Sequence, residues 1–427
     1  RFSTGLRGYN LSSPASTVLK LSVELPTFAL AAKGDRKTLF RWYSDLAEET
    51  SSDALPFQDG YIITDTTRVM AILQDEKQER RSYMGGQPAP RGCFHEDALI
   101  FLHGDRHREA RAALARAVPH LAQPVGPEAV HIIPDSLIKT AAATVWYSVF
   151  QAEASEETLA LFADYSNYGG LCVLGQTFHT VTGNWVLRRI LRIREALTPI
   201  AAETHVGQAI LREGLNLSMI VDGILFAGFL STKHVLDAAR HAFATDPHLT
   251  LQWYMNRDKT LLDILKHNPP VTSVTSFSPE PQTMRVLGES RTLDRGTMFQ
   301  VVLSETLRTS QNNKGLILWN APLDKLETSP RSCPAAGLSR SMNRQLVEEA
   351  VVKGGLNGAL TSVPSISAAS EGTTAARLFA LLGLILLSWL RPRDMSGVVW
   401  LFGGVALAWP QVEGEEISLS YPVPATA

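Results

Sequence analysis

The feature that most constrains the fold is an apolar run in the middle of the chain. Residues 217–244 read LSMIVDGILFAGFLSTKHVLDAARHAFA, with a helical period and few charges. A surface helix carries one apolar stripe and one polar face, whereas a helix that is apolar on nearly all sides is buried. The run therefore predicts a long helix that crosses the middle of a large domain.

The segments around this run have mostly helical periodicity. Helices are expected over 36–49, 104–118, 260–271 and 340–353, and over most of 130–245. Residues 59–66, DGYIITDT, alternate in polarity and predict a strand that leads into a short helix, and residues 284–303 predict strands around a glycine turn. The expected fold class is mainly α with minor β, in one interlocked domain.

Charge and cysteine usage exclude several classes of function. The 427 residues include 40 Lys+Arg and 42 Asp+Glu without a long basic stripe, so no nucleic-acid partner is expected. Cys93, Cys172 and Cys333 lack C-x-x-C spacing, which argues against a disulfide framework or a zinc ribbon. This cysteine usage fits a reducing compartment, and at least one thiol is available as a metal ligand. With no signal peptide or anchor visible, we expect a cytoplasmic or peripheral membrane location.

Cys333 is the best candidate for that ligand. It lies in RSCPAAGLSR, just before a predicted helix whose first turn offers unpaired N–H groups to a thiolate. Arg331 can place a cation beside an anionic ligand, and the small side chains of Ala335 and Ala336 would let a flat cofactor approach closely. An isolated cysteine is more often a small buried apolar residue, so the ligand role depends on the other motifs.

The stretch Cys333-Pro-Ala-Ala-Gly-Leu-Ser-Arg340 resembles the heme-binding signature C-x-G-x-x-L-A-R of the cytochrome P-450 family. The family's basic residue two before the cysteine is Arg331, but its upstream Phe and glycines fall on Leu326, Glu327 and Ser329. The resemblance implies a heme-thiolate enzyme with heme b (iron protoporphyrin IX) and Cys333 as the metal ligand. It also implies one P-450-like domain over 36–427 after an N-terminal extension, 1–35.

Other parts of the family pattern occur in the same order. GDRHREAR (104–111) resembles the family helix with His-x-x-x-Arg, which implies that His107 and Arg111 bind heme propionates. RVMAILQDEK (68–77) resembles an early strand-to-helix unit of the family. Thr275 stands near a position where the family often has another propionate-binding arginine, which implies weaker anchoring of the heme.

The family's Glu-x-x-Arg pair has two candidates in this chain. Glu305-x-x-Arg308 matches the letters, but the family pair precedes a Pro-Pro-Val-type turn, several strands and, much later, the cysteine. The Pro-Pro-Val turn of this chain, residues 269–271, follows a helix that contains Asp263 and Lys266. Asp263 lies 70 residues before Cys333, whereas Glu305 lies only 28 residues before it. We expect the Glu305 match to be chance and Asp263 with Lys266 to be a weaker ion pair, because lysine lacks the bidentate fork of arginine.

The central run AGFLST (227–232) stands where the family helix carries A-G-x-[DE]-T. The resemblance implies that Ala227 lies against the cofactor, and that an acid and a threonine deliver protons during dioxygen activation while the thiolate supplies electron density. The acid falls on Leu230, which cannot relay a proton. The alcohol falls on Ser231, with Thr232 beside it, so these two are the catalytic candidates. Phe229 and Leu230 would keep the distal side dry.

Two mechanisms remain open at this point. A monooxygenase would bring protons through Ser231, Thr232, ordered water or a polar group of the substrate, and would use a separate reductase or ferredoxin. A heme-thiolate enzyme that needs no proton relay would be a peroxygenase, a hydroperoxide isomerase or a cyclase. A plain helical interaction protein is a third class, and it predicts no absorbance beyond the protein band.

The expected substrate pocket has mainly apolar walls. These walls are residues 82–94, 166–176, 226–231 and 271–277, and they include Phe229, Leu230, Val271 and Val274. Such a lining suits a small apolar or amphipathic molecule better than a charged metabolite. We expect this molecule to belong to specialised (secondary) metabolism.

An unusual apolar insertion is expected near the end of the chain, at about 355–410. It contains two runs, 378–390 and 397–409, each of 13 residues and too short to span a bilayer. A buried hairpin or helix pair and a peripheral membrane or partner contact through 378–409 both remain open.

Overall fold

The computed structural model describes residues 36–57, 60–78, 83–84, 87–88, 98–174, 181–271, 273–309, 317–319, 321–323, 326 and 329–354. The expected N-terminal extension 1–35 and the insertion at about 355–410, with both apolar runs, lie outside the described residues. Most of the expected pocket wall 82–94 also lies outside them.

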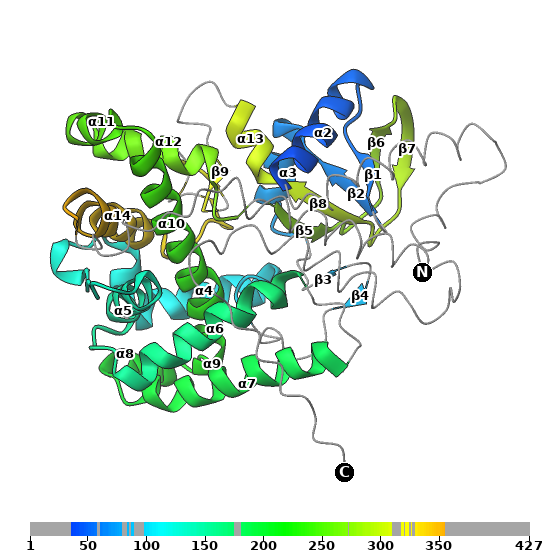
Figure 1. The fold of residues 1–427 in the computed structure, drawn as a ribbon. Helices are drawn as coiled ribbons and strands as arrows, with labels where there is room; N and C mark the ends of the chain where they lie inside the picture. Colours follow the sequence, from blue (N-terminus) through cyan, green and yellow to red (C-terminus); the bar gives the residue numbers. More distant parts are fainter. Residues whose placement is uncertain are drawn as a thin grey trace, which may run out of the picture.

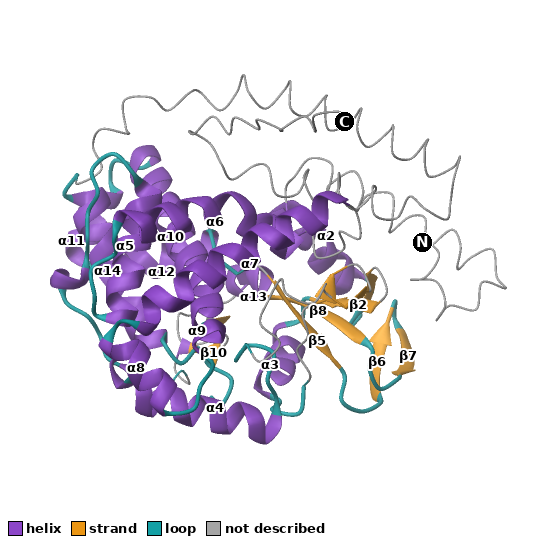
Figure 2. Ribbon diagram, turned by 90° about the horizontal axis from the view of Figure 1, so that it is seen from below, coloured by secondary structure: helices purple, strands orange, loops and turns teal. Residues whose placement is uncertain are grey.

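Most helices gather on one side of the molecule and most strands on the other (Figures 1 and 2). The helices are α2 (Arg36–Glu49), α3 (Thr66–Gln74), α4 (Gly104–Ala117), α5 (Leu137–Phe150), α6 (Glu156–Leu174), α7 (Val181–Ala202), α8 (His205–Arg212), α9 (Leu217–Gly223), α10 (Leu230–Thr245), α11 (Leu249–Met255), α12 (Arg257–His267), α13 (Leu303–Thr309) and α14 (Ala336–Val347). Short 3-10 turns are η1 (Pro119–Ala122) and η2 (Pro127–Ala129), and π-helical turns are η3 (Ile224–Phe229) and η5 (Glu348–Val352). This balance confirms the expected fold class, mainly α with minor β.

The main sheet has the strand order β1-β2-β8-β5. The strands are β1 (Leu55–Phe57), β2 (Gly60–Ile63), β3 (Tyr83–Met84), β4 (Gln87–Pro88), β5 (Ser273–Phe277), β6 (Gln282–Val286), β7 (Glu289–Leu293), β8 (Met298–Val302), β9 (Ile317–Leu318) and β10 (Ala321–Pro322). β2 and β8 pair in parallel, with Ile62 opposite Gln300, and the other pairs of this sheet are antiparallel. Ile63, Phe299 and Val301 form its core with one face of α3.

A tight hairpin joins β6 and β7 beside this sheet. Its turn residues Leu287 and Gly288 both have positive φ, at 52° and 82°. Two consecutive positive φ values are typical of a type I′ turn, whose twist matches that of the flanking strands. The hairpin was expected around a glycine within 284–303, whereas β5 was not expected as a strand.

The central helix runs from Leu217 to Thr245 through α9, η3 and α10. One end lies near α12 and the other near α7 and α8 (Figure 1). By length and composition it is the one helix of the described segments that could cross a membrane, but 56% of its apolar window is buried within the protein. The predicted buried central helix is therefore confirmed, while the π-helical turn η3 was not expected.

The helical core surrounds this helix. Phe162 of α6 lies edge-on between Trp146 of α5, at a centroid distance of 6.2 Å, and Phe229, at 5.0 Å. Edge-to-face aromatic pairs of this kind add to the free energy gained from burying apolar area. α5, α6 and η3 are thereby packed into one unit.

Several element boundaries follow from local chemistry. Asp65 ends the segment after β2 and accepts a hydrogen bond from the Arg68 N–H at 2.9 Å, which caps α3. α12 ends at His267, before the Pro-Pro pair that cannot continue a helix. The helix after Cys333 begins at Ala336, four residues earlier than expected, and continues into η5.

Candidate functional site

Cys333 lies in the turn that precedes α14. Its N–H donates to the carbonyl of Trp319 at 2.8 Å, and its own carbonyl accepts from the Ala336 N–H at 3.2 Å. The thiol is free and half-buried. The main chain of Cys333 is therefore fixed by hydrogen bonds at both its N–H and its carbonyl, just before the first residue of α14.

The surroundings of this thiol act on its pKa in opposite directions. Burial raises the pKa of the Cys333 thiol, while a hydrogen bond from the Ala335 N–H and the positive charge of Arg111 lower it. Burial lowers the pKa of the Arg111 guanidinium, and a Cys333 thiolate raises it. Arg111 is thus the cation whose charge acts on the sulfur, and a negative charge there would be partly neutralised.

Arg111 also binds the residue before the cysteine. From α4 it donates to the main-chain carbonyl of Ser332 and, at 3.1 Å, to the Ser332 hydroxyl oxygen. That hydroxyl in turn donates to the carbonyl of Ser329 at 2.9 Å. Ser332 is buried, so α4 is joined directly to the cysteine turn. His107 is also buried and lies four residues before Arg111 on α4.

Arg331 is held by main-chain carbonyl groups of the protein. The residue is 5% exposed, and its guanidinium donates to three main-chain carbonyls. These are Leu102 at 2.6 Å, Gln78 at 2.9 Å and Glu76 at 3.3 Å. The bonds join the cysteine turn to the segments that follow α3 and precede α4.

The central helix presents an open face around its π-helical turn. Ala227 is exposed although its helix crosses the core, and a Cβ added at Gly223, one turn earlier, would meet nothing within 4 Å. The Ser231 hydroxyl donates to the carbonyl of Ala227 and, at 3.2 Å, to that of Gly228. Its proton is thus shared with its own helix. Thr232 is buried.

The four residues expected to line a substrate pocket lie in different surroundings. Phe229 is fully buried against α6, and Leu230 packs against the same helical core. Val271 is 46% exposed, and Val274 packs against the core of the sheet. The Thr275 hydroxyl donates to the Gln300 side chain across β5 and β8 at 3.1 Å.

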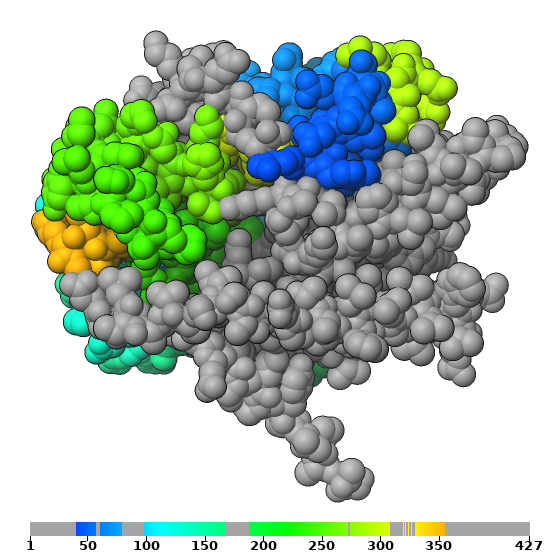
Figure 3. Space-filling view, turned by 45° about the horizontal axis from the view of Figure 1, so that its top comes forward, coloured from blue at the N-terminus to red at the C-terminus, as the bar shows by residue number. Residues whose placement is uncertain are grey.

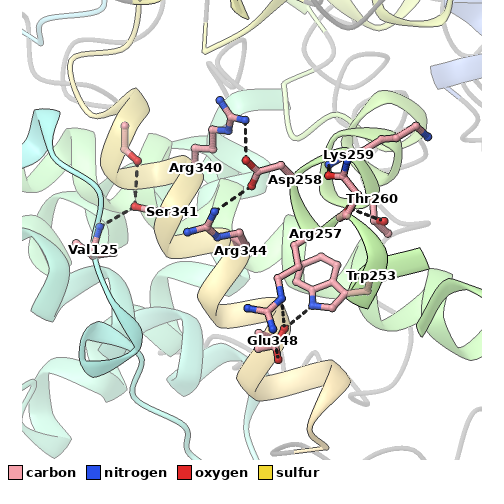
Figure 4. Close-up of polar contacts among 12 residues, drawn as sticks. Val125, Trp253, Arg257, Asp258, Lys259, Thr260, Arg340, Ser341, Arg344 and Glu348 are labelled. Atoms are coloured by element: carbon pink, nitrogen blue, oxygen red, sulfur yellow. Dashed lines mark hydrogen bonds and ion pairs between the residues drawn. The ribbon is translucent and has the colours of Figure 1, made fainter. Parts of the chain in front are cut away.

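α14 is tied to α12 and α11 by side chains (Figure 4). Asp258 of α12 pairs with Arg340 at 3.1 Å and with Arg344 at 3.2 Å. The buried carboxylate of Glu348 accepts from the Trp253 indole N–H and lies 3.2 Å from Arg257 Nε. In the space-filling view, the orange surface of α14 and η5 accordingly adjoins the green surface of α10 to α12 (Figure 3).

α12 is the helix expected to carry the shortened ion pair of Asp263 and Lys266. Asp263 pairs with Lys259 of the same helix, Oδ2 to Nζ at 2.7 Å, on a half-exposed face. The contact between α12 and α14 is made by Asp258, through its ion pairs with Arg340 and Arg344. Glu305 is buried in α13 after β8, and the order α12, β5 to β8, α13 agrees with the interpretation that the Glu305 match is chance.

Sequence patterns did not reveal several residues that hold this region. The Trp319 indole donates to the Ser339 hydroxyl at 3.0 Å, so that Trp319 contacts the cysteine turn and α14 together. The buried side chains of Arg194 and Asp222 form an ion pair at 3.6 Å between α7 and α9. Asp222 could have been noticed as the lone acid in the apolar run LSMIVDGILF, since a buried charge needs a partner.

Comparison with known proteins identifies the fold. No protein-family model and no curated protein matches the sequence. A structure of P-450BioI with an acyl carrier protein ligated to hexadec-9Z-enoic acid matches with a TM-score of 0.56 and 12% identity, over 74% of this chain and 91% of that chain.

Two further structures show the same similarity. The structure of CYP109E1 from Bacillus megaterium in complex with testosterone matches with a TM-score of 0.53 and 12% sequence identity, over 73% of this chain and 89% of that chain. The structure of P-450 RauA, complexed with a biosynthetic intermediate of aurachin RE, matches with a TM-score of 0.51 and 13% sequence identity, over 75% of this chain and 90% of that chain. The chain therefore has a divergent cytochrome P-450 fold.

Proposed function

We propose that this chain is a heme-thiolate oxidoreductase of the monooxygenase type, with heme b held through Cys333. The observation that carries the proposal is the free thiol just before α14, which the Ala335 N–H hydrogen-bonds and on which the Arg111 guanidinium acts as a positive charge. Cysteine thiolate is one of the few side chains that ligate heme iron. In a chain with a cytochrome P-450 fold, this thiol is the natural iron ligand.

The residues around the thiol fit such a group. A flat macrocycle needs a helix face without large side chains, and Gly223 and Ala227 provide one on the central helix. Arg111 is a partly buried cation whose charge acts on the thiol, and the buried His107 lies one turn earlier on α4. We assign Ala227 to the distal face and His107 and Arg111 to the cofactor edge.

Bound iron porphyrin would supply dioxygen activation, and a thiolate ligand favours O–O cleavage. The chain's own contribution is narrower. The Ser231 hydroxyl can accept a hydrogen bond from water or substrate while its proton stays on the carbonyls of Ala227 and Gly228. Phe229 and Leu230 exclude water from the adjoining core. A proton would therefore come through ordered water or a polar group of the substrate, with Thr232 as a second candidate.

A second candidate function is a heme-thiolate enzyme that needs no proton relay, such as a peroxygenase, a hydroperoxide isomerase or a cyclase. The observation that favours it is the combination of Leu230 at the acid position and a Ser231 proton held by its own helix. Neither side chain is arranged to deliver a proton from bulk water.

The proposed substrate is a small apolar or amphipathic molecule of specialised metabolism. The similar structures contain an acyl chain on a carrier protein, a steroid and a biosynthetic intermediate. Under the monooxygenase proposal, a separate reductase or ferredoxin donates the electrons. Under the alternative, a hydroperoxide replaces both donor and dioxygen, or a cyclisation of the substrate needs neither.

The test is the visible spectrum of the reduced, carbon-monoxide-bound protein after reconstitution with hemin. We expect a Soret band at the red-shifted position typical of thiolate ligation, lost in Cys333→Ser and retained in the matched control Cys172→Ser. Colourless protein, or an imidazole-type spectrum, would contradict the proposal. Turnover with NADPH and redox partners supports the monooxygenase, whereas turnover without any reductant, with or without a hydroperoxide, supports the alternative.

A further inference from the structure

We propose that Arg331 is a positioning residue, which clamps the cysteine turn to the α3–α4 connection and does not bind a cofactor carboxylate. The consequence for the iron rests on the proposed function. The clamp itself consists of hydrogen bonds within the protein, so it can be tested with or without cofactor.

The three acceptors of Arg331 come from two separate segments. Nη1 donates to the carbonyl of Leu102, and Nη2 donates to those of Gln78 and Glu76. The Gln78 side chain also accepts from the Ser276 hydroxyl of β5 at 3.0 Å. The turn that carries Cys333 is thereby fixed to the start of α4 and, through Gln78, to the main sheet.

Arg111 makes the reciprocal contact. Arg331 reaches from the cysteine turn to the α3–α4 connection, while Arg111 reaches from α4 to the carbonyl and hydroxyl of Ser332. The two residues that precede Cys333 are therefore held from opposite directions. A shift of the thiol relative to α4 would have to break bonds of both arginines.

The geometry argues against a carboxylate on Arg331. The bonds to Leu102 and Gln78 are buried, and a buried carbonyl that loses its donor is costly. A bidentate propionate would use Nη2, which already donates to the carbonyls of Gln78 and Glu76, so it would have to displace one of these bonds. Arg111, by contrast, lies next to the thiol and acts on it as a charge. Arg331 thus acts only as a clamp, whereas Arg111 both holds Ser332 and acts on the thiol as a charge.

The first experiment measures alkylation of Cys333 by iodoacetamide in the cofactor-free full chain, with Cys93→Ser and Cys172→Ser as background. Lysine keeps the charge of Arg331 but cannot reach both segments with a planar fork. We expect Arg331→Lys and Arg331→Gln both to raise the rate by about tenfold, because local opening exposes the thiol. The control Arg116→Gln, whose side chain is exposed on α4 and pairs with Glu213 outside the clamped segments, should keep the original rate. An unchanged rate in Arg331→Lys overturns the clamp.

The second experiment compares the affinities for iron protoporphyrin IX and for its dimethyl ester. A clamp predicts that Arg331→Lys and Arg331→Gln weaken both by the same factor and shift the Soret band of both complexes. A carboxylate ligand predicts that Arg331→Gln weakens the diacid alone, and this result would overturn the proposal. If the unmodified chain binds neither porphyrin, the proposed function fails, and the alkylation rates still decide the clamp. Circular dichroism verifies that each variant is folded.

Discussion

The Trp253 indole of α11 donates a hydrogen bond to the carboxylate of Glu348, 95 positions later in the chain. Arg257 approaches the same carboxylate, whose side chain is only 4% exposed. The pair joins α11 to η5, the turn that continues α14.

We expect Glu348→Gln to lower the free energy of unfolding by about 2–3 kcal/mol, since it leaves Arg257 and buried polar groups without their anion. Asp258→Asn is the matched comparison, because its carboxylate joins the neighbouring pair α12 and α14 but is 41% exposed. Its loss should stay below about 1 kcal/mol and shrink in high salt. Urea denaturation measures both, and equal losses would contradict the assignment of Glu348 as a buried anchor.

Gly337→Ala should destabilise the protein by about 1–3 kcal/mol through overpacking. A Cβ at this position of α14 would lie 2.6 Å from the main-chain oxygen of Ala122, so the helix would have to move away from η1. Gly223→Ala, where the added carbon meets open space, should be neutral or gain up to about 1 kcal/mol. Thermal unfolding compares the two, and a neutral Gly337→Ala would argue against this close approach.

Ala227→Phe tests the open face of the central helix. Because Ala227 is exposed, the larger side chain should change stability by about 0.5 kcal/mol at most. It should nevertheless abolish hemin uptake, since the ring would occupy the space proposed for the macrocycle. Leu251→Phe, on the exposed part of α11, is the control and should bind hemin normally. Full uptake by Ala227→Phe would place the cofactor elsewhere.

The thiol of Cys333 should ionise late in the cofactor-free protein. Burial raises its pKa above the ordinary 9.0, against the lowering effects of Ala335 and Arg111. Because the folded value is the higher one, the folded state holds more protons above pH 9.0, and stability falls as pH rises through that range. Arg111→Met removes a lowering charge, so the midpoint of the alkylation profile should move to still higher pH. A downward movement would contradict the placement of Arg111 beside the sulfur.

Asp53 gives the opposite pH dependence. Burial raises the pKa of this carboxyl, but hydrogen bonds from the Arg285 N–H and guanidinium, with the charge of Arg68, bring the net value below 3.8. The stabilisation is therefore present above pH 3.8 and is lost as pH falls through the folded value. Asp53→Asn should destabilise the protein at pH 7, and the difference should vanish in strong acid. A difference that persists at low pH would mean that the amide itself disturbs the β1–β6 region.

The periodic segments could be predicted from the sequence. The buried helix after residue 217, the helix at 36–49 and the stop before Pro269 depend on local patterns of apolar residues and proline. The partners of Arg331 could not be predicted, because main-chain carbonyls carry no side-chain signal and lie more than 220 positions away in the chain. Phe229 shows a different limit, since an aromatic side chain suits a pocket wall and a core equally well.

The turn Ile224–Phe229 has a further consequence for the central helix. This π-helical turn contains one residue more than a regular α-helical turn would. The second half of the helix is therefore rotated about the helix axis relative to the first half. Deleting one residue there would rotate everything downstream by about 100°. Asp222 would keep its place facing Arg194, while Ser231 and Thr232 would turn toward other neighbours. A single inserted residue thus decides which side chains the second half of the helix presents to the middle of the molecule.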